Sequence, residues 1–580
     1  MKKKFMACAL AAMTVFSLAA TSCGENPTTN NSSNNNIRFY LWSSDGSNPA
    51  GFSKVLDTFN SGAGKDLGVQ LSFAFDTQGD YKQKLNLAMA SGQDQYDVVF
   101  DAAWIYLSEF AKKDYYYNLE SYFNNDAYPG LKKSFDTNYL NKNKFNGGVY
   151  GIPLTQTFSD ISVAYIRKDW REECAADANF VKPAGIATSS VTASNLVDGI
   201  DNFDELEYYL YWIKSNKSGV VPALSNNDAT WGAWDLANTH ELASKTANDY
   251  VKAGVKTNIL IRQGVEASAY IERDEVVAVS INDYLDPQSS GSLKDFPAGF
   301  NQVDSKWQED YEITRKWAKD GIMSADVMSV TDADSQFEAG TGAVVVQSIN
   351  NFTAVEARLK ANNPGAELEI YVNDPAIREK RENYAQTDFK AWNYLCVPKT
   401  VSKEKLDSIM KFFDWLFVSE ENHDLFQYGI KGVHWDVAKD ANGNEIEGTV
   451  DTMGFESYTF PAYELTWNTN YIRVQSASDP KVQEYMEYMF DMDRYVEILH
   501  SEFTFDSQRT AELASAVNNA SLGTAISKAR SYQLGQINDP VSSWNAELKG
   551  RYQDASFQLA MKTIQNEIKT QLQQYIDSLE

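Results

Sequence analysis

Hydrophobic and polar residues follow two alternating periods at the start of the folded chain. An apolar run over 37–42 predicts a strand, and the stripe that begins at Phe52 repeats at i, i+3, i+4 and i+7, the spacing of a helix. A second strand is predicted over 69–75, then a helix whose apolar face begins at Tyr81, then a third strand over 96–100. This order predicts a parallel, right-handed α/β sheet.

Polar and aromatic residues follow each of these three strands. In open α/β sheets ligands bind outside the carboxyl ends of the strands, so residues at these positions are candidates for ligand contact. The candidates are Trp42 and Asp45 after the first strand, Asp76 and Gln78 after the second, and Asp101 and Trp104 after the third.

The N-terminus has the pattern of an export signal. Three lysines at 2–4 precede an apolar run over 5–20, and a cysteine follows at Cys23. The run is shorter than the roughly 20 residues that a membrane-spanning helix needs, which weighs against a transmembrane anchor. The pattern resembles the lipobox of bacterial lipoproteins, which implies that Cys23 is lipidated and becomes the first residue of the exported chain.

The segment 24–36 carries no large apolar side chain and consists mainly of Asn, Ser and Thr. Such a segment cannot offset its own ordering entropy, so we expect a disordered tether. Residues 1–22 are therefore predicted to be a signal peptide and 23–36 a lipidated tether. The body of the protein is expected on the extracytoplasmic face of the cell membrane.

Composition narrows the classes of partner. Some 544 residues follow Asn36, enough for two or more domains, and no later segment has the pattern of a membrane span. The formal net charge of −27 and the absence of a basic patch argue against nucleic acid. Cys174 and Cys396 are predicted to be two separate thiols, with Cys396 buried in an apolar strand.

Common catalytic and cofactor motifs are absent from the sequence. No G-x-G-x-x-G follows the first strand, and the chain contains no P-loop, H-E-x-x-H or G-x-S-x-G. The four histidines show no metal-ligand spacing. The segment 440–445 predicts an Asn-Gly hairpin turn, because Ala438 occupies the first ligand position that an EF-hand loop would need. We therefore expect no cofactor, no metal and no enzymatic step.

Short blocks along the chain resemble those of the family 1 extracellular solute-binding proteins of ABC importers, in particular their larger lipoprotein branch. The blocks are 80–92 with 96–100, 148–153, 203–206, 337–346, 397–400 with 409–417, 429–435 and the amphipathic last helix with Met561, Ile564, Ile568 and Leu572. The resemblance implies a two-lobed periplasmic-binding-protein fold with a hinge and a central cleft. It also implies a monomer that delivers its ligand to a membrane permease.

The resemblance implies two lobes, each built from separate stretches of chain. The first lobe is predicted from residues 37–157 with 388–428. The second lobe is predicted from 158–387 with 429–580.

The ligand class is predicted from the aromatic residues, which make up 13% of the chain. A sugar ring has apolar C–H faces and a polar rim, so its site needs flat aromatic side chains beside carboxylates and amides. The strand-end residues named above have this mixture. Further candidates with the same character are Trp231, Trp234, Asn350, Asp388, Trp392 and Trp435. These residues favour a carbohydrate, and in particular an oligosaccharide.

Other interpretations of the same residues remain open. Many aromatic residues are core residues, and an aspartate at a strand end often caps the next helix. A surface glycoside hydrolase would need two carboxylates about 5–9 Å apart, and the 79 acidic residues neither show nor exclude such a pair. A lipoprotein that binds a peptide, a polyamine or a metal ion would use the same fold.

Overall fold

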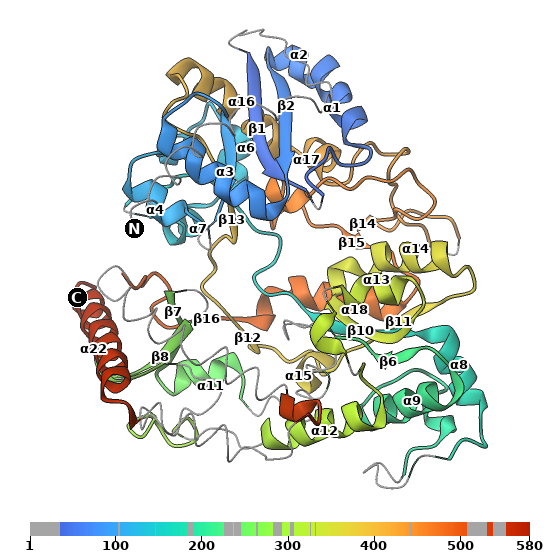
Figure 1. Cartoon of the computed structure of the whole chain (residues 1–580). Helices are drawn as coiled ribbons and strands as arrows, with labels where there is room; N and C mark the ends of the chain where they lie inside the picture. Colours follow the sequence, from blue (N-terminus) through green and yellow to red (C-terminus); the bar gives the residue numbers. More distant parts are fainter. Residues whose placement is uncertain are drawn as a thin grey trace, which may run out of the picture.

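The structure is a computed structural model. It describes residues 35–43, 45–102, 105–145, 147–181, 183, 190–225, 236, 245–262, 265–281, 293–301, 307–324, 326–330, 332–440, 442–506, 531–536 and 553–579. Two α/β lobes, each with its own central sheet, lie one above the other in Figure 1. The predicted fold class is confirmed.

The first lobe is built on a five-stranded sheet in the order β2-β1-β3-β13-β4. β1 is parallel to both β2 and β3, while β13 is antiparallel to β3 and β4. The three strands predicted from the sequence are therefore present and parallel. The strands are β1 (Asn36–Trp42), β2 (Gln70–Asp76), β3 (Val98–Asp101), β4 (Ile152–Leu154) and β13 (Asn393–Cys396).

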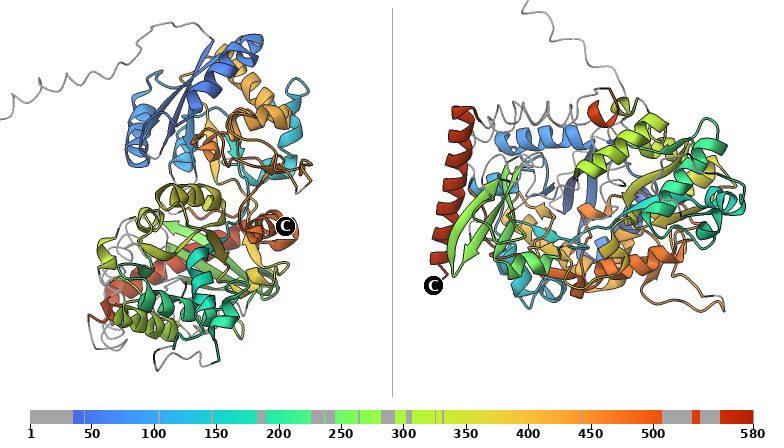
Figure 2. Two further views of the ribbon diagram at one scale, coloured as in Figure 1. Left: turned by 90° about the vertical axis from the view of Figure 1, so that its right-hand side faces the viewer. Right: turned by 90° about the horizontal axis from the view of Figure 1, so that it is seen from below.

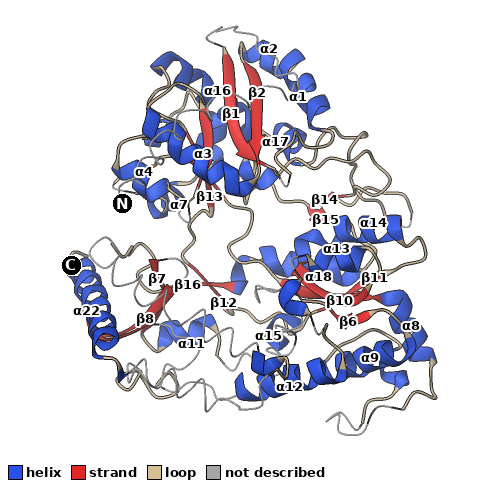
Figure 3. Ribbon diagram, viewed as in Figure 1, coloured by secondary structure: helices blue, strands red, loops and turns tan. Residues whose placement is uncertain are grey.

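Helices cover both faces of this sheet (Figure 3). Phe52, Val55 and Phe59 of α1 are buried, as the helical spacing of the apolar residues predicts. The helices are α1 (Phe52–Ser61), α2 (Ala63–Leu67), α3 (Gln78–Ser91), α4 (Leu107–Lys112), α5 (Glu120–Phe123), α6 (Pro129–Ser134), α7 (Thr137–Lys142), α16 (Lys403–Val418) and α17 (Glu420–Gln427).

The second lobe is built on a four-stranded sheet in the order β11-β5-β10-β6. Its strands are β5 (Ser162–Arg167), β6 (Val221–Ala223), β10 (Gly342–Ser348) and β11 (Leu368–Tyr371). Its helices are α8 (Lys168–Ala176), α9 (Phe203–Asn216), α12 (Trp307–Asp320), α13 (Ala333–Glu338), α14 (Phe352–Asn362), α15 (Pro375–Arg378) and α18 (Pro480–Phe490), with 3-10 turns η1 (Ala193–Leu196), η2 (Val327–Ser329), η3 (Ile349–Asn351) and η5 (Met492–Arg494).

An antiparallel sheet of three strands and the last helix form an additional layer at one side of the second lobe (Figure 2). Met561, Ile564, Ile568 and Leu572 are buried against the sheet, which confirms the predicted apolar face of this helix. The elements are α11 (Ala247–Lys252), β7 (Val255–Arg262), β8 (Val265–Glu272), β9 (Glu275–Ile281) and α22 (Ala555–Asp577).

Three stretches of chain connect the lobes: 155–161 after β4, 388–392 before β13, and 472–479 before α18. Two short parallel ladders flank them, β12 with β16 and β14 with β15. The short elements here are β12 (Ala385–Thr387), β14 (Thr449–Val450), η4 (Ala462–Glu464), β15 (Val474–Gln475) and β16 (Tyr495–Glu497).

The third connection differs from the expected lobe boundary. The resemblance implies that the second lobe resumes at residue 429, whereas Phe460, Leu465 and Tyr471 are buried in the core of the first lobe. Val482 and Met486 of α18 are buried in the core of the second lobe. The chain therefore leaves the first lobe some forty residues later, after an irregular segment that covers the end of the β1 strand.

The predicted turn near 440–445 and the two thiols can be compared with the structure. Gly443 at φ 85° and a bridge between Lys439 and Glu445 confirm the hairpin turn near 440–445. Cys174 and Cys396 are both free and both buried. Among the described residues, no cluster of His, Cys, Asp and Glu is arranged to hold a metal ion, and no helix is both long and apolar enough to span a membrane.

Candidate functional site

The direction of the strands shows which edge of each central sheet faces the other lobe. We call this the interlobe edge. β1 and β2 are parallel, and Figure 1 shows their carboxyl ends directed at the second lobe. In the second lobe Ser348, at the carboxyl end of β10, pairs with Ser162, which directly follows the first connection. The carboxyl end of β10 therefore also lies at the edge between the lobes, where an α/β sheet places its ligand.

Four aromatic side chains meet at this edge of the first lobe. Trp42 Nε1 donates to the Tyr463 hydroxyl at 2.7 Å. The Tyr463 ring lies 5.6 Å from Trp467, and the Trp467 ring lies 6.2 Å from Trp392 in an edge-to-face arrangement. Trp42 is buried, and the other three rings are half-buried. We call Trp42, Trp392, Tyr463 and Trp467 the aromatic cluster.

The aromatic cluster is anchored through Trp42 and Glu464. The Trp42 ring packs edge-on against Phe100 at 4.5 Å, and its backbone N–H donates to Glu464 Oε2 at 3.0 Å. Glu464 is fully buried, and this burial holds the pKa of its carboxyl well above the usual range. Asn393 Nδ2 donates to the backbone carbonyl of Tyr463 at 3.3 Å. These contacts hold the Trp42 side of the cluster in the core of the first lobe, while the other three rings stay half-exposed.

Two predicted aspartates at the strand ends differ in environment. Asp76 is half-buried and accepts hydrogen bonds from the Tyr40 hydroxyl at 2.7 Å and from Lys84 Nζ at 2.5 Å. Asp101 is fully buried. Its carboxylate accepts from the backbone N–H of Ala102 and Tyr106 and from the Tyr116 hydroxyl.

The role of Asp101 follows from these contacts. These three partners belong to the loop after β3 and to the core beneath it, at 2.8–3.0 Å. Burial raises the pKa of Asp101 to about 7. These contacts indicate that Asp101 holds the loop after β3 in place. Asp101 is therefore not among the proposed ligand contacts.

The remaining candidates of the first lobe are spread around the edge. Asp45 is exposed and accepts from the backbone N–H and the hydroxyl of Ser47, which closes a local turn. Gln78 is exposed at the start of α3. Trp104 lies outside the described residues, as do Trp231 and Trp234, the two candidates that follow β6.

The second lobe places a pair of polar side chains at its own strand end. Asn350 Nδ2 donates to Asp160 Oδ1 at 3.1 Å. Burial raises the pKa of Asp160, although Asn350 and the backbone N–H of Ile161 oppose this effect. Nearby, Arg494 Nη1 donates to the Ser159 carbonyl at 3.1 Å. An amide and a carboxyl group are thus available on the second lobe.

The last two candidate residues are Asp388 and Trp435. Asp388 is in the second connection and accepts from the Lys390 N–H at 3.0 Å. Trp435 is buried with Val437 and Val450 in a small separate hydrophobic cluster. Its Nε1 donates to the Gly429 carbonyl at 3.0 Å.

A cavity of about 500 Å³ lies between the lobes at the connections. Lys142 of α7 and Asn470 line it from the first lobe, and Tyr495 lines it from the second. Phe158 and Phe389 of the connections meet there edge to face, with ring centroids 5.0 Å apart. Its volume is in the range of small-molecule sites.

Phe389 has an unusual backbone conformation. Its φ of 54° is in the left-handed region, which costs a non-glycine residue of order 1 kcal/mol or more. The Phe389 N–H donates to the Thr387 hydroxyl at 2.9 Å, which holds the turn. Such strain is characteristic of hinges and ligand sites.

Sequence reasoning identified Trp42 and Trp392 of the aromatic cluster but not Tyr463 and Trp467. It also missed Phe158 and Phe389. Tyr463 lies in the short 3-10 turn η4, and the other three lie in irregular segments, where no period distinguishes a surface ring from a core ring. The available signal was local composition, since Tyr463 and Trp467 follow Phe460 in the stretch 458–467, which is rich in aromatic residues.

Comparisons with known proteins agree on the fold. Residues 43–270 match the sequence profile described as bacterial extracellular solute-binding protein. No curated protein matches the chain in sequence.

Three solved structures superpose on almost the whole chain. The N-glycan transport solute-binding protein NgtS of Streptococcus pneumoniae has a TM-score of 0.59 at 15% identity, covering 94% of this chain and 100% of its own. An HMO-binding, ABC-transporter-associated protein of Bifidobacterium longum infantis has a TM-score of 0.52 at 12% identity, with coverage of 94% and 98%. The S. pneumoniae ABC-transporter substrate-binding protein FusA in complex with kestose has a TM-score of 0.50 at 12% identity, with coverage of 94% and 99%. The chain therefore has the two-lobed fold of these structures, and its residues 43–270 match the profile of the bacterial extracellular solute-binding proteins.

Proposed function

We propose that this protein captures a carbohydrate, in particular an oligosaccharide, between its two lobes and delivers it to the permease of an ABC importer. The observation that carries the proposal is the aromatic cluster, whose half-exposed rings at the interlobe edge match the apolar faces of sugar rings. The amide and carboxyl of Asn350 and Asp160 supply partners for hydroxyl groups on the opposite lobe. The three solved relatives named above are described as binding or transporting saccharides, which supports this ligand class.

Binding would use both lobes. Stacking on Trp392 and Trp467 supplies apolar contact, and closure about the three connections brings the second lobe onto the ligand. Asp76 and the cavity beside Phe389 extend the candidate surface for a ligand longer than one sugar unit. The protein carries out no chemical step in this proposal, acts as a monomer and needs no cofactor.

A thermal-shift screen of the purified Cys23→Ser protein tests the ligand class. Monosaccharides, oligosaccharides, peptides, polyamines and metal ions are compared, and we expect melting to rise by several degrees with one oligosaccharide series only. A ligand at 100 times its Kd stabilises the native state by about 2.7 kcal/mol. A shift with a peptide, polyamine or metal ion alone would overturn the carbohydrate assignment. Release of reducing ends from polysaccharides would favour the glycoside hydrolase alternative.

Substitutions locate the site once a ligand is known. We expect Trp467→Ala and Trp392→Ala each to weaken binding by about 1–3 kcal/mol in calorimetry, because each removes a stacking surface. Phe389→Ala tests whether the ligand reaches the cavity at the connections. Trp435→Phe, in the separate cluster, is the control and leaves affinity unchanged. Unchanged affinity in both Trp392 and Trp467 variants would contradict the site.

We also propose that Cys23 carries a lipid anchor. We expect the full chain to sediment with membranes, and a Cys23→Ser variant to shift to the soluble fraction, because an acyl anchor contributes about 0.8 kcal/mol of membrane affinity per buried CH₂ and serine cannot carry the thioether-linked lipid. Quantitative blotting of both fractions measures this. Equal distribution of the two proteins would contradict lipidation at this residue.

A further inference from the structure

A second cavity, of about 720 Å³, lies on the first lobe between α1, α16 and α17. Figure 1 shows α2, whose first residue also lines this cavity, at the end of the first lobe farthest from the second lobe. Among the described residues, its lining shares none with the aromatic cluster or with the cavity at the connections. Its volume is in the range of small-molecule sites. We call this space the outer cavity, and its walls include Thr58, Phe59, Trp415, Glu421, Asn422 and Arg473.

The Trp415 ring is a half-buried wall of the outer cavity. It packs against Phe59 and Phe426, with ring centroids 4.9 and 6.4 Å away. Asn422 Nδ2 donates to the Trp415 backbone carbonyl at 2.8 Å, which joins the end of α16 to α17. The core of the first lobe therefore holds the ring in place, and its remaining surface is available for a ligand to stack on.

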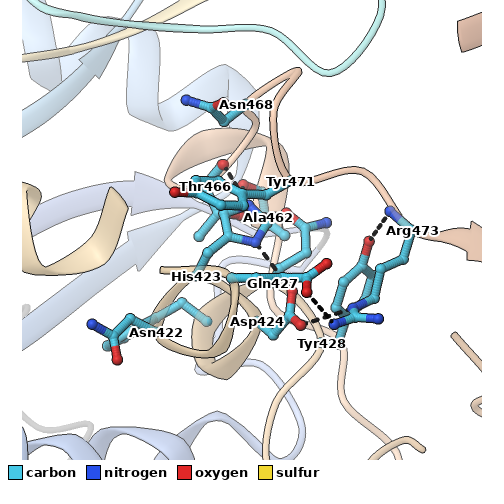
Figure 4. A network of polar contacts seen from close by, with 12 residues as sticks. Asn422, His423, Asp424, Gln427, Tyr428, Ala462, Thr466, Asn468, Tyr471 and Arg473 are labelled. Atoms are coloured by element: carbon cyan, nitrogen blue, oxygen red, sulfur yellow. Dashed lines mark hydrogen bonds and ion pairs between the residues drawn. The ribbon is translucent and has the colours of Figure 1, made fainter. Parts of the chain in front are cut away.

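Ion pairs fix the polar wall of the outer cavity. Arg473 Nε lies 2.8 Å from Asp424 Oδ2, as Figure 4 shows, and Arg473 Nη2 lies 3.0 Å from Glu420 Oε2. Only 11% of the Arg473 side chain is exposed, whereas Glu420 and Glu421 at the start of α17 are exposed. Guanidinium donors and carboxylate acceptors therefore lie side by side in a fixed arrangement.

The charges of the lining select among classes of ligand. Asp424 and Glu420 already have Arg473 as a counter-ion, which leaves little attraction for an organic cation. Glu421 and Lys431 add one charge of each sign. The carboxylates repel an anion, and a hydrocarbon would bury these charges without supplying hydrogen bonds. A neutral saccharide matches the lining best, because it has an apolar face for the ring and hydroxyl groups that both donate and accept.

We propose that the outer cavity is a second saccharide-binding site, in which the Trp415 ring stacks on a sugar unit while Arg473 and Glu421 hydrogen-bond its hydroxyl groups. The ligand class rests on the proposed function, since it assumes that the protein meets saccharides outside the cell. The walls belong to the first lobe, apart from Arg473 at the start of the third connection. Binding here therefore does not need the lobes to close, and one chain can hold saccharide at two places.

Indole NMR of the Cys23→Ser protein labelled with 15N-tryptophan reports on both sites in one titration. Single Trp392→Phe, Trp415→Phe and Trp467→Phe variants assign the signals. The probes are maltotetraose, cellotetraose, mannotetraose and kestose, with spermidine and trilysine as cationic controls. We expect a saccharide to shift the Trp415 signal along a saturation curve of its own. Its affinity should be about tenfold or more weaker than at the interlobe site, because one ring contributes where the aromatic cluster presents three.

A variant that fills the outer cavity tests the location of the second site without removing a packed ring. Thr58 is exposed and lines the cavity, so Thr58→Arg places a longer side chain in this space. We expect Thr58→Arg to lose the Trp415 shift and to keep the Trp467 shift. The matched control is Asp57→Arg, one residue earlier on α1 and exposed, which should keep both shifts. A Trp415 shift that persists in Thr58→Arg would overturn the proposal.

The two tryptophan signals separate failure of this site from failure of the proposed function. A Trp467 shift without a Trp415 shift would overturn the second site and leave the proposed function intact. A Trp415 shift that follows the Trp467 curve and disappears in Trp467→Ala would also overturn it, because the signal then reports only on the interlobe site. A Trp415 shift with spermidine or trilysine alone would overturn the saccharide class. A Trp415 shift without shifts of Trp392 and Trp467 would overturn the proposed function and support the outer cavity, and no shift of any of the three would overturn both.

Discussion

Replacing Asp97 by alanine is expected to lower the free energy of unfolding by about 3–5 kcal/mol, because it breaks a buried ion network and strands its cations. Asp97 is fully buried and directly precedes β3. It accepts from the Arg38 backbone N–H at 2.8 Å and from Arg38 Nε at 3.0 Å, and Lys405 Nζ lies 2.7 Å away. The network joins β1, which carries Trp42 of the aromatic cluster, to the start of β3 and to α16.

The matched control is Asp94→Ala. Asp94 pairs with the same Arg38 side chain, but 62% of its own side chain is exposed. Exposed ion pairs contribute about 0–1 kcal/mol, so we expect a loss in that range. Urea unfolding followed by tryptophan fluorescence measures both variants. Equal losses would show that burial of Asp97 does not decide its contribution.

The charge state of the Arg38 side chain depends on the same contacts with Asp97. Hydrogen bonding to Asp97 raises the pKa of the Arg38 guanidinium, against the opposing effect of burial. The Arg38 guanidinium therefore stays charged. This is why Asp97→Asn, which keeps the shape but not the charge, is expected to be nearly as destabilising as Asp97→Ala.

The sheet of the first lobe could be predicted because residues close together in the sequence determine its strands and helices. Residues 37–100 alternate between the two hydrophobic periods without interruption, and short loops leave few ways to connect the elements. The positions Trp42 and Asp76 at the strand ends follow directly from that topology. Both lie at the interlobe edge in the structure.

The sequence does not indicate in the same way which lobe the segment 430–471 belongs to. It contains few regular elements, so its position depends on long-range packing of Phe460, Leu465 and Tyr471 against helices far away in the sequence. No periodicity encodes that choice. Tyr463 and Trp467 were missed for the same reason, since their exposure depends on where this segment packs.

The environment of the Asp101 side chain could not be predicted from the sequence either. A strand-end aspartate has the same sequence signature whether it faces a ligand or turns inward to cap a loop. Here three donors from Ala102, Tyr106 and Tyr116 hold the carboxylate inside. Only the packing of the Tyr116 hydroxyl beneath β3, fifteen residues later in the chain, distinguishes the two cases.

Lys256 of β7 is expected to make the stability of the protein rise with pH between about pH 8 and pH 10.5. Its side chain is buried, and its ammonium donates to the Leu499 carbonyl at 2.9 Å. Burial, with a smaller contribution from Lys390, lowers the pKa of Lys256 to about 8. In the unfolded chain a lysine has a pKa of about 10.4.

The direction of the effect follows from proton counting. Between pH 8 and pH 10.5 the unfolded chain holds a proton on Lys256 that the folded protein has released, so raising the pH favours the folded state. Below pH 8 both states are charged, and the full cost of burying the ammonium is present. The change across this window is about 3 kcal/mol, at about 1.4 kcal/mol for each pKa unit.

A Lys256→Met variant isolates this contribution, because methionine fills a similar volume and carries no charge. We expect Lys256→Met to be more stable than the wild type at pH 7, and this advantage to shrink by about 3 kcal/mol at pH 10.5. Lys252→Met, at an exposed position on α11, should change stability by less than about 0.5 kcal/mol at either pH. Urea unfolding at the two pH values measures all three proteins. A Lys256→Met advantage that stays constant with pH would mean that the Leu499 carbonyl compensates fully for burial of the charge.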